Sequence, residues 1–336
     1  MQSILALQLV FFNYFDYYCT RFFNICTMKN LLLTICLCLL ASITFAQQKF
    51  TYEYAVKDTN HLKLDVYAPT QPHELHPCMI FVFGGGFIGG ARDDRQLPEL
   101  MQYYTDKGWV VVSIDYRLGL RGAEHLSVIS GIKKFRTAIE MAGEDLISAT
   151  DYILKNLLQT PNWTINPDLI VTVGSSAGAI TALQADYFLG NRSHNATLLP
   201  DTFHYAGVMS FSGLIYSTQG KVKYRVHAPA PTLFCHGTVD QLVPYNKIQI
   251  FNQGTFGSHA LIKRFEKYDY PYHIRRYEGM GHEVAGYYKY EFKMMDEFIE
   301  DYIFGKKKLQ IDELYYNPNL KRHPHGSFKI RDLKKL

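Results

Sequence analysis

Cysteine is scarce in this chain of 336 residues, and the few cysteines are unevenly distributed. Four of the six lie within the first 46 residues, which leaves Cys78 and Cys235 for the rest of the protein. Both stand in apolar runs of the kind that forms buried strands. Two isolated thiols make neither a disulfide framework nor a multi-cysteine metal site. We therefore expect both to be free thiols in the core, and we expect no metal centre.

A strong excess of charge is also missing. The formal net charge is +4. The basic residues gather in residues 305–336, so residues 47–304 are slightly acidic. Domains that bind nucleic acid carry a basic face, so nucleic acid is not the expected partner. The basic tail could contact an anionic surface or a glycan, but we favour a solvated or loosely docked extension. No feature of the sequence indicates an oligomeric state.

The apolar stretch near the N-terminus is short for a membrane anchor, which is the alternative interpretation of this segment. Residues 28–46 read MKNLLLTICLCLLASITFA, with one lysine, a short apolar core and small residues before Ala46. This pattern is typical of a secretory signal peptide that is cleaved after Ala46, whereas a membrane span needs a longer apolar core. Residues 1–27 are interpreted as an extension upstream of the true start at Met28. The mature protein is therefore expected to be secreted or periplasmic, without a membrane span.

The remaining sequence alternates strands and helices without an internal repeat or a long linker. Residues 50–56 and 61–69 alternate apolar and polar positions around a turn at 58–60, which predicts an antiparallel hairpin. Continuous apolar runs follow, and helices are predicted between and after them over residues 97–107, 134–158, 177–189, 246–265 and 285–303. This order predicts the α/β class, with a mainly parallel sheet and helices on both faces. We expect one catalytic domain over residues 47–304 and a basic extension over 305–336.

A glycine-rich stretch, VFGGGFIGG, follows the first of these apolar runs. Gly84, Gly86 and Gly89 have the spacing of a dinucleotide-binding loop. Such a loop normally follows the first strand, opens an apolar helix and has an acidic residue about 20 positions further on. Here two strands precede the loop, charged residues follow it, and the candidate Asp115 stands too far along the chain. No nucleotide cofactor is therefore expected, and the bare backbone amides must serve another purpose.

A second small-residue motif offers that purpose. Gly174-Ser175-Ser176-Ala177-Gly178 matches G-x-S-x-G and lies between a predicted buried strand and a helix. A serine on a sharp strand-to-helix turn needs small neighbours if its hydroxyl is to project above the sheet. The helix that follows directs its free N–H groups to the place where negative charge develops. Ser176 is therefore the candidate nucleophile.

An acid and a histidine follow Ser176 in the order that such a nucleophile requires. Asp240 comes just after one apolar run, and His282 lies in a glycine-flanked loop after another. Alone, Asp240 would be interpreted as a turn former and His282 as an ordinary loop residue. Together, in this order and each after a strand, they predict a catalytic triad of Ser176, Asp240 and His282.

The motifs FGGGF, DYRLG, GSSAG, HGTVDQLVP and GMGHE as a set resemble those of α/β-hydrolases of the esterase/lipase group, close to carboxylesterases with an HGGG-type loop. The resemblance extends from about Phe50 to Phe304. It implies the α/β-hydrolase fold, no cofactor or metal, and an oxyanion hole made by backbone N–H groups of Gly85, Gly86 and Ala177. The sequence departs from the pattern at Phe83, where the family usually has histidine. We favour an aromatic packing substitute over a degenerate, weakly active site.

The resulting hypothesis is a secreted serine hydrolase that cleaves carboxylic esters, with short acyl groups, through an acyl-enzyme intermediate. A carbohydrate esterase acting on acetyl-xylan or feruloyl groups is the alternative, so the expected partner is a small ester or an esterified carbohydrate. A serine peptidase is disfavoured because no propeller is present, and a non-catalytic binding protein has only Phe83 in its favour. Tyrosines within residues 285–292 could stack on sugar, although we favour packing. Arg117 and the pair Glu144-Asp145 are expected to be structural.

Overall fold

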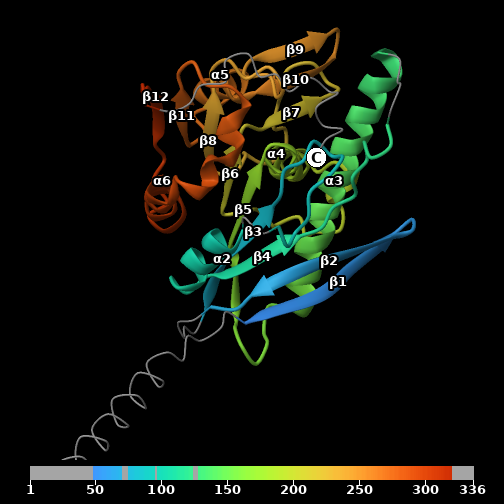
Figure 1. Cartoon of the computed structure of the whole chain (residues 1–336), viewed down its shortest axis with the longest axis vertical. Coiled ribbons are helices and arrows are strands. Elements are labelled where there is room, and N and C mark those ends of the chain that lie inside the picture. Colours follow the sequence, from blue (N-terminus) through green and yellow to red (C-terminus); the bar gives the residue numbers. More distant parts are fainter. Residues whose placement is uncertain (1–47, 70–74, 95–96, 124–127, 320–336) are drawn as a thin grey trace, which may run out of the picture. The chain divides into compact units, whose positions relative to one another are not determined.

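The computed structural model describes residues 48–69, 75–94, 97–123 and 128–319. The predicted signal segment and residues 320–336 lie outside the described residues. A nine-stranded sheet is the centre of the described chain (Figure 1). In spatial order its strands are β1 (Lys49–Lys57), β2 (Asn60–Tyr67), β4 (Val110–Ile114), β3 (His76–Val82), β5 (Ile165–Ser175), β6 (Gly207–Phe211), β8 (Thr232–Gly237), β11 (Tyr272–Tyr277) and β12 (Gln310–Tyr315).

The sheet is antiparallel at its N-terminal edge and parallel elsewhere. β1 and β2 form the predicted hairpin, with Asp58 at a positive φ of 55° in the turn. β2 pairs antiparallel with β4, and every later pair, from β4–β3 to β11–β12, is parallel. All residues of β4, β6 and β8 are buried, as expected of strands covered on both faces. The predicted fold class is confirmed, and Cys78 and Cys235 are buried free thiols.

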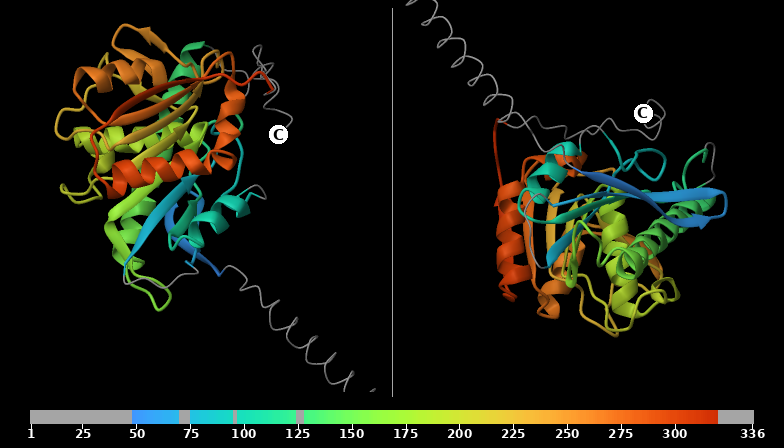
Figure 2. Two further views of the ribbon diagram at one scale, coloured as in Figure 1. Left: turned by 90° about the vertical axis from the view of Figure 1, so that its left-hand side faces the viewer. Right: turned by 90° about the horizontal axis from the view of Figure 1, so that it is seen from below.

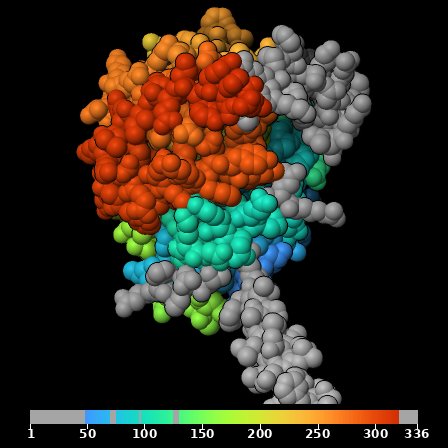
Figure 3. All heavy atoms as spheres, turned by 60° about the vertical axis from the view of Figure 1, so that its left-hand side comes forward, coloured from blue at the N-terminus to red at the C-terminus, as the bar shows by residue number. Residues whose placement is uncertain are grey.

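Helices cover both faces of the sheet (Figure 2). On one face α2 (Pro98–Thr105) packs against α6 (Phe292–Phe298), where the rings of Tyr103 and Phe292 stack with centroids 4.4 Å apart. Figure 3 shows the teal surface of α2 beside the orange and red surface of the last helices. On the other face α3 (Val128–Asn156) packs on α4 (Ala177–Asn191). None of the helices in the described chain has the length and hydrophobicity needed to cross a bilayer.

Two predicted helices were partly wrong. Most of the first half of 246–265 is a hairpin of β9 (Lys247–Ile250) and β10 (Gln253–Gly257), and only α5 (Ser258–Lys267) is helical. β10 pairs with β7 (Leu214–Ser217), which makes a second, three-stranded sheet. Because β7 is distant in sequence, local periodicity could not reveal this pairing. The predicted helix over 285–303 is instead a 3₁₀-helix η2 (His282–Lys289), then α6, then a π-helical segment η3 (Ile299–Phe304).

The predicted domain boundary at residue 304 was also wrong. β12 lies within the expected extension, yet it pairs in parallel with β11 along all six of its residues. Cross-strand ion pairs support this register, since Arg275 Nε lies 2.9 Å from Glu313 Oε2 and Arg276 Nη2 lies 2.7 Å from Asp312 Oδ2. Two of the three acidic residues of residues 305–336 thus meet two arginines, and the folded domain continues at least to Tyr315.

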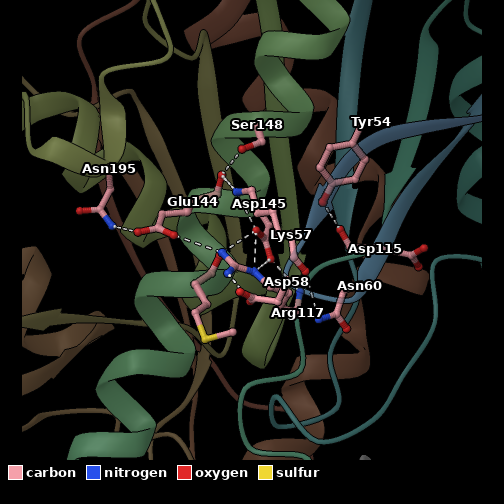
Figure 4. A network of polar contacts seen from close by, with 11 residues as sticks. Tyr54, Lys57, Asp58, Asn60, Asp115, Arg117, Glu144, Asp145, Ser148 and Asn195 are labelled. Carbon is pink, nitrogen blue, oxygen red and sulfur yellow. Dashed lines mark hydrogen bonds and ion pairs between the residues drawn. The ribbon is translucent and has the colours of Figure 1, made fainter.

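A buried ion-pair network joins the hairpin, the loop after β4 and helix α3 (Figure 4). The Asp145 carboxylate has no exposed surface and accepts bonds from the Arg117 guanidinium, at 2.9–3.0 Å, and from the Arg117 backbone N–H. Lys57 Nζ lies 2.9 Å from the same carboxylate, and Glu144 Oε2 lies 3.1 Å from Arg117. Arg117, Glu144 and Asp145 are therefore structural, as predicted.

Replacing Arg117 should destabilise the fold, because the buried Asp145 carboxylate loses the guanidinium and keeps only Lys57 and the backbone N–H of residue 117 as partners. We expect Arg117→Ala to lower the free energy of unfolding by about 3 kcal/mol. Arg136→Ala is a matched control. It breaks a more exposed pair with Glu140 in α3, the helix that carries Asp145, and should cost only about 0.5 kcal/mol. Urea unfolding followed by circular dichroism measures both, and equal losses in the two variants would contradict the prediction.

A second buried carboxyl group lies on α4. Asp186 is 6% exposed, and its carboxylate accepts a bond from Ala230 N–H at 3.3 Å. Burial raises the pKa of Asp186 to about 7, and the bond from Ala230 opposes this rise only in part. The folded protein therefore keeps this proton at pH values where the unfolded chain, with a pKa of about 4, has already lost it. Stability should fall as the pH rises from about 4 to about 7 and then level off.

Asp186→Asn should remove this pH dependence. The variant should match the parent at pH 4 and be more stable by roughly 4 kcal/mol at pH 8, because a neutral amide avoids the cost of a buried charge. Thermal and urea unfolding at the two pH values provide the measurement. Asp168 is exposed, so the control variant Asp168→Asn should show the same difference in unfolding free energy between pH 4 and pH 8 as the parent. A variant no more stable than the parent at pH 8 would be inconsistent with a buried neutral carboxyl.

Candidate active site

Ser176 occupies a strained turn between β5 and α4. Its φ is 53° and its ψ is −118°, a backbone conformation that non-glycine residues rarely adopt. The two glycines of the motif make this turn possible. A Cβ on Gly174 would lie 2.3 Å from the Gly178 carbonyl oxygen, and one on Gly178 would lie 2.0 Å from the Val82 carbonyl oxygen. The motif therefore lets α4 begin directly against the end of β3.

His282 and Asp240 come from the loops after β11 and β8. His282 Nε2 lies 2.8 Å from Ser176 Oγ, and His282 Nδ1 lies 2.8 Å from Asp240 Oδ2. A carboxylate accepts only, so Nδ1 carries the proton and Nε2 is free to accept from the serine hydroxyl. The structure thus brings the three predicted triad residues together in a continuous hydrogen-bonded chain. This geometry allows the serine to lose its proton to the histidine as it attacks an electrophile.

The Asp240 carboxylate is held from several sides. Its side chain has no exposed surface, and Oδ1 accepts bonds from the backbone N–H groups of Leu242 and Val243, each at 3.0 Å. Burial alone would raise the pKa of Asp240, but hydrogen bonds from His236 and His282 hold this pKa well below its usual range. The carboxylate therefore stays ionised beside His282.

Sequence reasoning missed a link between the serine turn and the histidine loop. Ser175, the residue before the candidate nucleophile, is buried, and its hydroxyl donates to the Ala285 carbonyl oxygen at 2.7 Å. Ala285 lies one turn after His282 in η2. This bond fixes the segment that carries His282 against the segment that carries Ser176. The signal was present in the sequence, because Ser175 is the polar x in the G-x-S-x-G motif.

The glycine loop lies against the serine turn. A Cβ on Gly84 would lie 3.3 Å from Ser176 Cβ. Gly85 and Gly86 have φ values of 113° and 64°, and a Cβ on Gly85 would lie 2.2 Å from the Gly89 carbonyl oxygen, so the loop needs glycine here. Within the part of the chain that the structure describes, the N–H groups of Gly85 and Gly86 donate to no other residue. These two N–H groups thus have no partner among the described residues.

Phe83, which directly precedes the glycine loop, packs as an aromatic residue. Its side chain is 6% exposed and stacks on Tyr116, with ring centroids 4.5 Å apart. The Tyr116 hydroxyl donates to the Phe83 carbonyl oxygen at 2.9 Å. Burial raises the pKa of Tyr116, so this hydroxyl remains a donor. The start of the glycine loop is thus held by an aromatic stack and a buried hydrogen bond, which agrees with the packing substitute favoured from the sequence.

The tyrosines after His282 have different environments. Tyr288 is buried, and its ring contacts those of Phe81 and Phe211, with centroids 5.1 and 6.1 Å away. Tyr287 is half-buried against Tyr277. Tyr290 is 76% exposed. Packing therefore accounts for Tyr287 and Tyr288, whereas Tyr290 has an edge-on contact with Tyr287 and is otherwise largely exposed. No group of three or more potential metal ligands occurs among the described residues.

A family model and several solved structures are similar to this chain. Residues 64–217 match the family model described as BD-FAE. This match includes the glycine loop and Ser176, whereas Asp240 and His282 lie beyond it. A comparison with curated proteins found no match.

Solved structures of an esterase from the planctomycete Thermogutta terrifontis have a similar fold. The native enzyme, Est2, is 19% identical over 75% of this chain and 91% of its own, with a TM-score of 0.53. Its propionate-bound form is 18% identical over 78% and 96%, with a TM-score of 0.53. The form phosphorylated by paraoxon is 19% identical over 75% and 94%, with a TM-score of 0.52. The chain therefore has the α/β-hydrolase fold.

Removing the Tyr116 hydroxyl should loosen the glycine loop without disturbing the aromatic stack. We expect Tyr116→Phe to slow the reaction of Ser176 with a fluorophosphonate probe about tenfold, because a buried carbonyl loses its donor and the loop amides lose their fixed position. Tyr103→Phe is the control, since its hydroxyl bonds to Asp296 on α6. Intact-mass spectrometry follows the adduct. Equal rates in both variants would show that the hydroxyl does not position the loop.

Proposed function

We propose that this protein is a serine hydrolase that cleaves carboxylic esters. The observation that carries the proposal is the hydrogen-bonded chain from Ser176 through His282 to Asp240, beside a glycine loop in which the N–H groups of Gly85 and Gly86 donate to no other described residue. The similarity in fold to esterases, including one phosphorylated by paraoxon, supports the same conclusion.

The proposed mechanism follows from this geometry. Ser176 Oγ attacks the ester carbonyl carbon while His282 Nε2 takes the serine proton. Asp240 holds His282 in the required tautomer and stabilises the positive charge that it gains. The oxyanion is stabilised by the N–H groups of Gly85, Gly86 and Ala177, each worth about 3 kcal/mol. His282 then protonates the leaving alcohol. Water then attacks the acyl-enzyme while His282 takes its proton, and His282 returns this proton to Ser176 Oγ as the acid leaves.

Short acyl groups are the proposed substrates. Structures of the Thermogutta esterase include propionate-bound and butyrate-bound forms, and these short acids support a similar preference here. An esterified carbohydrate is the second candidate. Tyr290 supports it, because it lies eight positions after His282 with 76% of its surface exposed and could stack on a sugar ring. We also propose secretion or a periplasmic location, from the signal pattern that ends at Ala46.

Replacement of the nucleophile tests the proposal. Ser176→Ala should lower kcat for p-nitrophenyl esters by a factor on the order of 10⁴–10⁶, because no other group can form the acyl-enzyme. Ser148→Ala is the control, since that hydroxyl only bonds within α3 to the Glu144 carbonyl oxygen. A series from acetate to octanoate measures the acyl preference, and acetyl release from acetylated xylan tests the carbohydrate alternative. If the parent and Ser176→Ala both hydrolysed these esters only at the background rate, the esterase proposal would be refuted and a binding protein would be favoured.

A further inference from the structure

His236 is a buried histidine that the proposed mechanism does not use. It lies in β8, four residues before Asp240, and has no exposed surface. Both of its ring nitrogens have partners. Nε2 lies 3.0 Å from the Val243 carbonyl oxygen and 3.4 Å from Asp240 Oδ2, while Nδ1 lies 2.8 Å from Ser258 Oγ. A histidine so enclosed has a single arrangement of hydrogen bonds that satisfies all of these atoms.

The partners of His236 determine its tautomer. Both oxygens near Nε2 can only accept, since one is a carbonyl and the other a carboxylate, so Nε2 must carry the proton. In the neutral ring Nδ1 is then an acceptor, and the Ser258 hydroxyl donates to it. Ser258 also has no exposed surface, so no solvent competes for this bond. The Ser258 hydroxyl therefore selects the form of His236 that can donate to Val243.

Val243 connects His236 to the candidate triad. Its carbonyl oxygen accepts from His236, while its N–H group donates to Asp240 Oδ1 at 3.0 Å. Val243, the last residue of the turn from Asp240, is thus bonded through its N–H group to the carboxylate and through its carbonyl oxygen to the imidazole. If His236 turned or changed tautomer, the amide donors of this turn would move away from Asp240.

Ser258 brings a third part of the chain into this arrangement. It is the first residue of α5 and directly follows β10, the central strand of the small sheet. A Cβ on the preceding Gly257 would lie 1.8 Å from the Pro244 carbonyl oxygen. The junction of β10 and α5 therefore packs directly against the segment that follows the Asp240 turn. The Tyr245 ring packs edge-on against His236, with centroids 5.4 Å apart. The small sheet therefore fixes where Ser258 stands.

We propose that Ser258 and His236 are positioning residues that hold the Asp240 carboxylate in register with His282, and that the small sheet β7–β10–β9 supports the site through them. This inference rests on the proposed esterase function. Neither residue touches the substrate or the reacting atoms. They act on the Asp240 carboxylate through Val243 and through the contact of His236 Nε2 with Asp240 Oδ2. The loss of the Ser258 hydroxyl should therefore weaken catalysis and leave substrate binding unchanged.

Kinetics of single and double variants in the full chain test this inference. Ser258→Ala should lower kcat about tenfold with KM unchanged, because a buried ring nitrogen loses its donor and Asp240 loses its fixed orientation. In an Asp240→Asn background the same change should have no further effect, since it acts only through that carboxylate. Ser217→Ala is the control, because this buried serine lies in β7 of the same small sheet and should keep the parent kcat.

Alternative results would overturn the inference. A lower melting temperature with unchanged kcat in Ser258→Ala would show a purely structural serine. Equal losses of kcat with and without Asp240→Asn would show that Ser258 does not act through the carboxylate. Ser258→Cys, which keeps the size but donates weakly, replaces the alanine variant if that variant does not fold, and should also lower kcat. Ser258→Thr keeps the hydroxyl and should retain most of the kcat.

A second measurement does not depend on esterase activity. Nitrogen NMR of protein labelled with ¹⁵N-histidine reports the tautomer of each ring, and the His236 signals are those lost in His236→Gln. We expect the parent to show the tautomer with the proton on Nε2 and Ser258→Ala to show a mixture. The opposite tautomer in the parent would refute the inference even if the protein is an esterase. The expected tautomer in an inactive parent would instead refute the proposed function alone.

Discussion

The close approach of two backbone segments is the constraint on which the site depends. The first turn of α4 begins so near the end of β3 that a Cβ on Gly178 would lie 2.0 Å from the Val82 carbonyl oxygen. This contact places the glycine loop, which continues from β3, directly beside Ser176. It also fixes the serine in a strained backbone conformation, which persists because the strands and the helix around it allow no other path. Larger residues in place of the two motif glycines would separate the loop from the serine.

Buried hydrogen bonds then join the loops at this edge of the sheet. Ser175 bonds to the histidine segment, Tyr116 bonds to the glycine loop, and His236 bonds to the turn after Asp240. A buried polar group that loses its partner costs free energy, so each bond holds its loop in one position. Donors fixed before the substrate arrives need no reorganisation during the reaction, and this is the property that makes a proposed oxyanion site effective.

The parts of the fold that depend on local pattern were predictable from the sequence. The N-terminal hairpin follows from alternation, the parallel strands follow from continuous apolar runs, and the helices at 97–107 and 177–189 follow from their places between those runs. The predictions failed where pairing is long-range. β10 is a strand because it pairs with β7, and β12 is a strand because it pairs with β11. Both partners are distant in sequence, and local propensity does not encode such pairing.

The sequence alone determined the fold class, the order of candidate residues along the chain and the need for glycine at the sharp turns, because each of these depends on neighbouring residues. Ser176, Asp240 and His282 could be selected for the same reason, since each follows a buried strand whose end lies at a common edge. Only the tertiary structure decided how the Phe83–Tyr116 stack holds the glycine loop, which strand completes the sheet and which groups donate to Asp240. These depend on contacts between segments far apart in the chain, and packing in three dimensions selects such contacts.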